Sequence, residues 1–196
     1  MREDTDLMLG WLKRRSLIAR KALELYGEVV AAARNPGFYG PGRGSDTPEG
    51  RFEFVALHLF LVAERIKGVA PDGAAVAQSM IEAFVTDMDD CMREMGVGDL
   101  TVAKRVQRAA ATFYERGGTY RAALASQPNA AGDPLIDVAR DALLRPNAEP
   151  SFAGALAEYI RASAANLAHV NPLSADRLKF ADIQFADSPR KAETTV

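Results

Sequence analysis

Residues 46–68 read DTPEGRFEFVALHLFLVAERIKG, and this stretch decides the fold class. Its apolar side chains recur every three or four residues from Phe52 to Ile66, which is the spacing of an α-helix that buries one face. Residues 46–49 supply a capping side chain, a proline for the first turn and an acid that complements the exposed N–H groups there. We therefore expect a helix that begins near Pro48 and ends before Gly68.

Three more amphipathic helices are expected around this stretch, and the four together would form the core. The first covers about residues 14–34 and leads into a loop, 35–45, whose glycines and proline a helix interior would not tolerate. The third covers about 73–95, and the fourth follows Asp99, which can cap it, and runs toward Leu124. On the third helix we expect these side chains to be buried: Ala77, Met80, Phe84, Met88, Cys91, Met92 and Met95.

The C-terminal third is less regular than the rest. Residues 127–150 are rich in Pro, Asn, Ala and Gly, and we interpret them as a connector that holds a short helix at about 134–144. Residues 151–196 then form a last helix, which ends before Pro172, and a tail.

Two structures fit this tail. Leu178, Phe180, Ile183 and Phe185 are spaced too irregularly to distinguish an extended arm from a short helix, and the chain after Ala186 is expected to fray. The whole pattern predicts an all-α fold. We expect one compact multi-helix domain over residues 1–196, with a long Gly/Pro loop after the first long helix and a helical C-terminal extension.

The composition limits the possible functions. The chain has 196 residues, 48% of them hydrophobic and 26% charged, which suffices for one buried core. Its formal charge of -2 offers little long-range attraction to phosphates, so DNA is not an expected partner. Cys91 is the single cysteine, and no apolar run approaches the roughly 20 residues that cross a bilayer. We expect a protein of the bacterial cytoplasm, with a peripheral position on the inner membrane left open.

The sequence offers no residues for catalysis. His58 and His169 are the only histidines, and neither stands in a spacing that builds a zinc or di-iron site. The glycine-rich segments lack the lysine of a phosphate-binding loop, and no serine-hydrolase motif occurs. We therefore expect no enzyme activity, no metal and no cofactor.

Acidic side chains gather on the third expected helix. Asp87, Asp90 and Glu94 share the face opposite its Met and Phe side chains, and Asp89 can pair with Arg93 four residues later. The spacing departs from the Asp-Asp-x-x-Asp motif of magnesium diphosphate sites, because Arg93 stands where the last acid is required. The cluster is then either a solvated face or a docking patch for a basic partner segment.

Two basic segments are also present. Near the N-terminus, an apolar edge precedes a run of bases: Leu7, Met8, Trp11 and Leu12, then Lys13, Arg14 and Arg15. We expect Trp11 and its neighbours to pack onto the core; the alternative is an interfacial helix whose apolar side meets lipid headgroups. The second patch is Lys104, Arg105 and Arg108, which would suit a salt-sensitive contact with ribosomal RNA.

Three blocks of sequence are more specific than helical periodicity. They are Phe38-Tyr39, then residues 46–53 with Leu57-His58, and then Asp87-Met88-Asp89 leading to residues 93–100. Together with residues 102–106, 113–116 and Tyr120, these blocks resemble the ubiquinol-cytochrome c chaperone family over about residues 26–124. The chain departs from the family pattern in its loop at 41–44 and at Ala103, where a glycine is expected.

This resemblance implies an assembly factor that binds newly made cytochrome b before that subunit joins ubiquinol-cytochrome c reductase. It also implies a small second chaperone as a partner and a position near the ribosome exit, as in the mitochondrial relatives. We expect the loop 35–45 and a polar seam on the second helix, which includes Arg51 and His58, to face the client. The residues expected to contact a partner are Arg51, Glu53, His58, Asp87, Asp89, Arg93, Glu94 and Asp99. A membrane-surface or protein-interaction adaptor without a cytochrome b client is the alternative.

Overall fold

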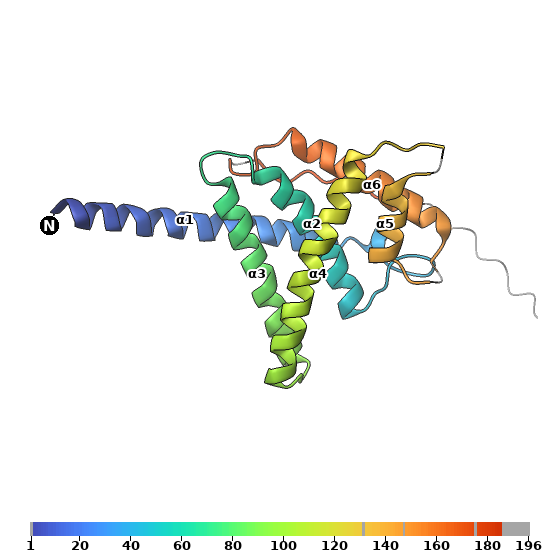
Figure 1. The fold of residues 1–196 in the computed structure, drawn as a ribbon, viewed down its shortest axis with the longest axis horizontal. Coiled ribbons are helices and arrows are strands. Elements are labelled where there is room, and N and C mark those ends of the chain that lie inside the picture. Colours follow the sequence, from blue (N-terminus) through green and yellow to red (C-terminus); the bar gives the residue numbers. More distant parts are fainter. Residues whose placement is uncertain (1, 131, 147, 175, 186–196) are drawn as a thin grey trace, which may run out of the picture.

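The computed structural model describes residues 2–130, 132–146, 148–174 and 176–185, and its regular elements there are helices (Figure 1). The all-α prediction is confirmed: the described residues form six α-helices and one short 3-10 helix, with isolated bridges in place of strands. In chain order the elements are α1 (Arg2–Ala33), η1 (Pro36–Phe38), α2 (Pro48–Ile66), α3 (Gly73–Glu94), α4 (Asp99–Ala125), α5 (Pro134–Leu143) and α6 (Pro150–Ala168).

Helix α2 lies at the centre of the core. Its start is as expected, because Thr47 Oγ1 accepts a hydrogen bond from Gly50 N at 3.2 Å and Pro48 occupies the first turn. The helix packs against α1, α3, α5 and α6 (Figure 1). As a result every residue from Ala56 to Ala63 is buried, on all faces of the helix and not along one stripe.

The loop after α1 is folded against the domain. Its chain reverses at Gly40 and Gly42, whose φ angles of 127° and 73° favour glycine. Gly42 O accepts a hydrogen bond from Glu149 N at 2.8 Å, and Gly44 pairs with Leu144 in an isolated bridge. The loop therefore connects the start of α2 to the junction between α5 and α6.

Helix α4 runs through Gly117 and Gly118 without a break. A Cβ at Gly118 would meet no atom within 4 Å, whereas one at Gly117 would lie 3.2 Å from the Phe60 ring. We expect Gly118→Ala to raise the free energy of unfolding by about 0.5–1 kcal/mol, the usual advantage of Ala over Gly within a helix. Gly117→Ala should gain less, because the ring must move. Chemical denaturation measures both, and equal gains would contradict this close packing of α4 on α2.

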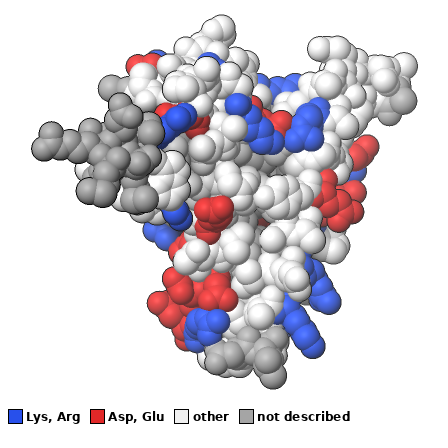
Figure 2. Space-filling view, turned by 60° about the vertical axis from the view of Figure 1, so that its left-hand side comes forward, with Lys and Arg blue, Asp and Glu red and all other residues white. Residues whose placement is uncertain are grey.

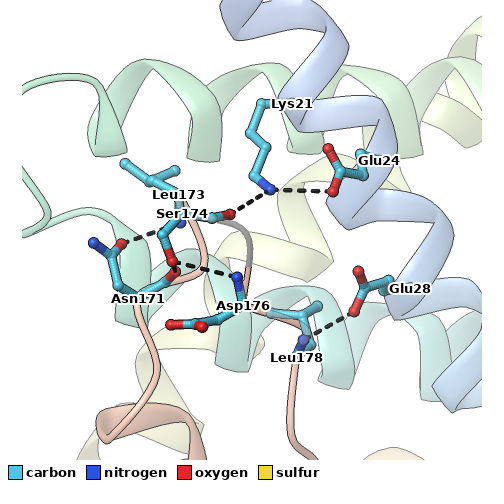
Figure 3. A network of polar contacts seen from close by, with 8 residues as sticks. All are labelled: Lys21, Glu24, Glu28, Asn171, Leu173, Ser174, Asp176 and Leu178. Carbon is cyan, nitrogen blue, oxygen red and sulfur yellow. Dashed lines mark hydrogen bonds and ion pairs between the residues drawn. The ribbon is translucent and has the colours of Figure 1, made fainter.

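The chain after α6 returns as an extended arm, residues 176–185, which decides between the two structures left open for the tail. Figure 3 shows how the start of the arm is attached to α1. Lys21 Nζ donates to Ser174 O at 3.0 Å, and Leu178 N donates to Glu28 Oε2 at 2.9 Å. The expected fraying concerns residues that lie outside the described part of the chain.

Helix α1 is longer than expected and projects from the domain. It begins at Arg2 and not near residue 14, and its N-terminal half extends beyond the other helices (Figure 1). Trp11 and Leu12 are 57% and 48% exposed, so the expectation that they pack onto the core is wrong. The reason is that no described helix runs alongside this half of α1 (Figure 1). The side chains of Leu7 and Met8 lie outside the described part.

The hairpin of α3 and α4 also projects, at the lower end in Figure 1. Phe84 and Met88 are buried as expected, and Gly96 ends α3 with a left-handed φ of 77°. Cys91, however, is exposed and Met95 is 56% exposed, so their expected burial is wrong. The last turns of α3 extend past α1, and in the described structure only α4 lies beside them (Figure 1).

Candidate partner-binding surface

The acidic edge of α3 consists of four carboxylates on its last turns: Asp87, Asp89, Asp90 and Glu94. Asp87, Asp90 and Glu94 are exposed, and their spacing places them on one face of the helix. Figure 2 shows acidic side chains gathered on one flank of the projecting hairpin. Like charges held this close make the edge attractive to a basic segment of a partner.

Asp87 is anchored to α1 by a hydrogen bond. Tyr26 Oη donates to Asp87 Oδ2 at 2.8 Å. Burial, and next the bond to this carboxylate, raise the pKa of Tyr26 far above its usual value, so the phenol remains a donor at every physiological pH. The acidic edge is thereby held in a fixed position relative to α1.

The expected pair on α3 is present. Arg93 Nε lies 2.6 Å from Asp89 Oδ2, four residues earlier along the helix. Within the described part of the chain, Asp90 and Glu94 have no ion-pair partner. These two carboxylates are therefore the most available charges of the acidic edge.

Arg51 is held beside the loop that precedes α2. Its Nε lies 2.6 Å from Asp46 Oδ1, and its guanidinium lies over the ring of Tyr39, 5.7 Å from the centroid. Burial raises the pKa of Tyr39 to about 12, while the positive charge of Arg51 opposes this effect. Arg51 is exposed and oriented by these contacts.

Arg34 follows directly after α1 and is exposed. Burial, and next the carboxylates of the acidic edge, raise the pKa of Cys91, and Arg34 is near enough to lower it. Arg34 acts in the same direction on the pKa of Tyr39. Arg34 is therefore within electrostatic range of both the loop and the acidic edge.

Glu53 lies elsewhere. It forms an ion pair with Arg116 of α4, and Arg116 Nη1 also donates to Ala142 O in α5 at 3.4 Å. Both side chains are half-buried. Glu53 therefore joins three helices of the domain, and the structure does not bring it to the acidic edge.

His58 is not on a surface seam. It is fully buried, because the rings of Phe38 in η1, Tyr159 in α6 and Phe180 in the C-terminal segment lie 5.5, 5.7 and 4.9 Å from its own. Phe54 O lies 2.6 Å from His58 Nδ1 and can only accept, so Nδ1 carries the proton and Nε2 accepts from Tyr159 Oη at 2.6 Å. Burial lowers the pKa of His58 to about 4, and the ring is neutral near pH 7. The expectation that His58 borders the surface is wrong.

Asp99 does not cap α4. Gly98 takes the cap position, where its carbonyl accepts from Thr101 N at 2.8 Å and Val102 N at 3.0 Å, and Asp99 is the first helical residue. The turn after Gly96 is short, so the helix begins one residue earlier than expected. The side chain of Asp99 lies outside the described part.

The basic edge of α4 consists of Lys104, Arg105 and Arg108, all exposed. Figure 2 shows basic side chains on the flank of the hairpin away from the acidic group. Met95 and Tyr114 add exposed apolar surface to the same hairpin, at 56% and 57% exposure. The hairpin can therefore offer charges of both signs and apolar contacts to a partner.

Two grooves lie on the surface of the described residues. One, of about 480 Å³, lies between α1, the α2–α3 connection and residues 171–174; the other, of about 350 Å³, lies between α2, α3 and α4. Among the described residues, no group of three or more His, Cys, Asp or Glu side chains could hold a metal ion. Within the same part of the chain, each helix is too short or too polar to span a bilayer.

Sequence reasoning missed Tyr26 and Tyr159, the hydrogen-bond partners of Asp87 and His58. By its spacing Tyr26 belongs to the apolar face of the first expected helix, and no sequence pattern singles out Tyr159. A tyrosine on the apolar face of a helix indicates a hydrogen bond to another element, because a buried hydroxyl requires a polar partner. The identity of that partner depends on how distant helices pack, so the sequence alone could not supply it.

Comparisons with known proteins extend this description. A sequence model of the family described as "Ubiquinol-cytochrome C chaperone" matches residues 43–174, a range that ends beyond the expected 26–124 and includes α5 and α6. The crystal structure of the Cbp3 homolog from Brucella abortus is similar, with a TM-score of 0.75 and 33% sequence identity. The similarity covers 92% of this chain and 99% of that chain. No curated protein matches the sequence.

Proposed function

Because the chain belongs to the ubiquinol-cytochrome c chaperone family, we propose that it binds newly made cytochrome b and holds this subunit while ubiquinol-cytochrome c reductase is assembled. The family supports a role in assembling this complex, and a protein client follows from that role. The observation that carries the finer proposal is the projecting hairpin of α3 and α4, where the acidic edge lies beside exposed apolar side chains.

The hairpin suits a membrane-protein client. Loops on the cytoplasmic side of such proteins are rich in Lys and Arg, and they lie next to apolar segments. Asp90 and Glu94 can attract the basic loop, while Met92 and Met95 offer flexible side chains that adapt to varied apolar surfaces. The basic edge of α4 is a candidate binding site for ribosomal RNA, whose phosphates would contact Lys104, Arg105 and Arg108.

Charge reversal on the acidic edge tests the client. In Asp90→Lys/Glu94→Lys, we expect recovery of newly made cytochrome b to fall about tenfold, because attraction to a basic loop becomes repulsion. The matched control is Asp141→Lys/Glu158→Lys, which reverses two exposed acids on α5 and α6. Pulse-labelled membranes, dissolved in mild detergent, are passed over each tagged full-length chain. Equal recovery by both variants would refute binding through the acidic edge.

We further propose that the projecting half of α1 lies on the membrane surface beside the client. Residues 9–23 contain five bases and no acid. Trp11, Leu12 and Leu17 are exposed there, which is the composition of a helix that rests at lipid headgroups. Arg15 lies over the Trp11 ring, 5.5 Å from its centroid, so a base accompanies the apolar side chain. Attachment of α1 to the membrane would keep the chaperone at the place where cytochrome b is inserted.

Trp11 is the single tryptophan and reports this contact directly. With vesicles that contain about one third anionic lipid, its emission should shift to shorter wavelength, whereas neutral vesicles should have little effect. Lys13→Glu/Arg20→Glu should weaken vesicle binding at least about tenfold, since each base near the surface contributes about 1 kcal/mol. Arg105→Glu/Arg108→Glu on α4 is the control for charge. An unshifted emission with anionic vesicles would rule the contact out.

A further inference from the structure

The C-terminal arm, residues 176–185, packs against Gly37 of η1, His58 of α2, and Phe152 and Ser163 of α6. The surface that these three elements form under the arm is termed the groove. The arm runs antiparallel to α6, since Ala181 contacts Ser163 and Phe185 contacts Phe152 near the other end of that helix. In Figure 1 this red segment returns along α6. The arm therefore covers core residues that the helices leave accessible from this side.

The side chains of the arm divide into two groups. Those that enter the groove are apolar and half-buried, and they pack against the core: Leu178, Phe180, Ala181, Ile183 and Phe185. Those that face solvent are polar: Arg177, Lys179, Asp182 and Gln184. The pattern is that of an extended peptide held by pockets for some of its side chains.

Three apolar side chains occupy defined positions. The Phe180 ring lies 4.9 Å from the ring of His58, and the Phe185 ring lies 4.9 Å from that of Phe152. Ile183 rests on Gly37, where any Cβ would overlap with it. The missing side chain at Gly37 therefore makes room for an occupant.

The floor of the groove has a row of polar groups that ends at the arm. His58 accepts from Tyr159, and Ser163 lies one helical turn after Tyr159 on α6. Ser163 is fully buried, and its Oγ accepts from Ala181 N at 3.0 Å. A buried acceptor aimed at a main-chain N–H recognises an extended chain whatever its sequence.

The arm is attached to the domain by few polar bonds. Its main chain makes three hydrogen bonds with side chains, to Ser174, Glu28 and Ser163, and within the described residues no main-chain bond joins it to another segment. Arg43 lies over the Phe185 ring at 5.2 Å. Half-buried side chains and few main-chain bonds are the properties of a segment that opens locally without unfolding the core.

We propose that this groove is a binding site for an extended apolar segment of a partner protein, and that the arm is its resident occupant. The partner segment displaces the arm, places apolar side chains where Phe180, Ile183 and Phe185 now lie, and donates a main-chain N–H to Ser163. The inference rests on the proposed function in one respect: the partner is the newly made client, whose apolar segments are still extended.

The test loosens the arm in the full-length chain. Phe180→Ala/Ile183→Ala removes two inserted side chains, and Phe185→Ala is a milder second variant. Lys179→Ala/Gln184→Ala changes two exposed side chains of the same arm and is the matched control. Circular dichroism confirms that each variant retains its helices.

The probe is a fluorescent peptide with the sequence of the arm, DRLKFADIQF. We expect Phe180→Ala/Ile183→Ala to bind it at least about tenfold more tightly than the unchanged chain, because apparent affinity scales with the fraction of molecules whose groove is open. Phe185→Ala should give a smaller gain, and the control none. Adding Ser163→Ala to the loosened variant should weaken peptide binding about fivefold, because the buried acceptor is lost.

The outcomes separate this inference from the proposed function. Equal peptide affinity in the loosened, control and unchanged chains would overturn the inference. Recovery of cytochrome b that neither rises with a loosened arm nor falls with added peptide would also overturn it, while the chaperone function would stand. Tighter peptide binding together with absent recovery of cytochrome b would support the groove and refute the proposed client.

Discussion

Gly50→Ala is expected to lower the free energy of unfolding by about 3 kcal/mol or more. A Cβ at Gly50 would overlap with the carbonyl oxygen of Ser45. Ser45 cannot easily move, because its Oγ lies 2.9 Å from Thr47 Oγ1 and is also contacted by Arg145. Relief would require the loop to leave the start of α2, which would break the Thr47 cap.

The control for this substitution is Gly154→Ala in α6, where a Cβ would meet no atom within 4 Å. That change should raise the free energy of unfolding by about 0.5–1 kcal/mol. Urea denaturation followed by circular dichroism measures both values. A loss below about 1 kcal/mol for Gly50→Ala would show that the loop is not seated on α2 as described.

Acidification should remove about 2–3 kcal/mol of stability between pH 6.5 and 4.5 through His58 alone. Burial lowers the folded-state pKa of His58 to about 4, against 6.5 in the unfolded chain. Above pH 6.5 both states are neutral at this residue and nothing is lost. Between pH 6.5 and 4 the unfolded state binds a proton that the folded state does not, so stability falls as the pH falls.

His58→Gln isolates this contribution. The variant loses stability at neutral pH, but its free energy of unfolding should depend less on pH in this window. Glu64 does not contribute to the pH dependence of stability in this window. Its hydrogen bond with Arg121 lowers its pKa to about 2, so the stability that this carboxylate provides is lost only below about pH 4.5. Urea titrations at half-unit steps measure the slopes. Parallel slopes in the two proteins would mean that His58 is not buried as a neutral ring.

Local rules predicted most of the fold. The capped start of α2, the glycine end of α3 and the continuous α4 depend on residues close together in sequence. Periodicity also identified the buried stripe of α2, but it could not show that helices would cover its other faces. His58 was therefore misplaced. Trp11 and Met95 were expected to be buried but are exposed. The sequence does not reveal that the neighbouring helices end before they reach these two side chains.

The contacts of the charged residues were predicted in part. The Asp89–Arg93 pair follows from helical spacing, and its presence is confirmed. The bond from Tyr26 to Asp87 and the ion pair between Glu53 and Arg116 join residues more than 60 positions apart, so they depend on packing. The partner-binding role of these residues stays a prediction.

Deletion of the gene, followed by a reduced-minus-oxidised spectrum of the membranes, tests the central claim most directly. The account predicts loss of the b-haem absorbance of ubiquinol-cytochrome c reductase and of its activity, with other respiratory complexes retained. The unchanged chain should restore both signals, and Asp90→Lys/Glu94→Lys should restore them poorly. Membranes with normal cytochrome b and normal reductase activity in the deletion strain would contradict the account.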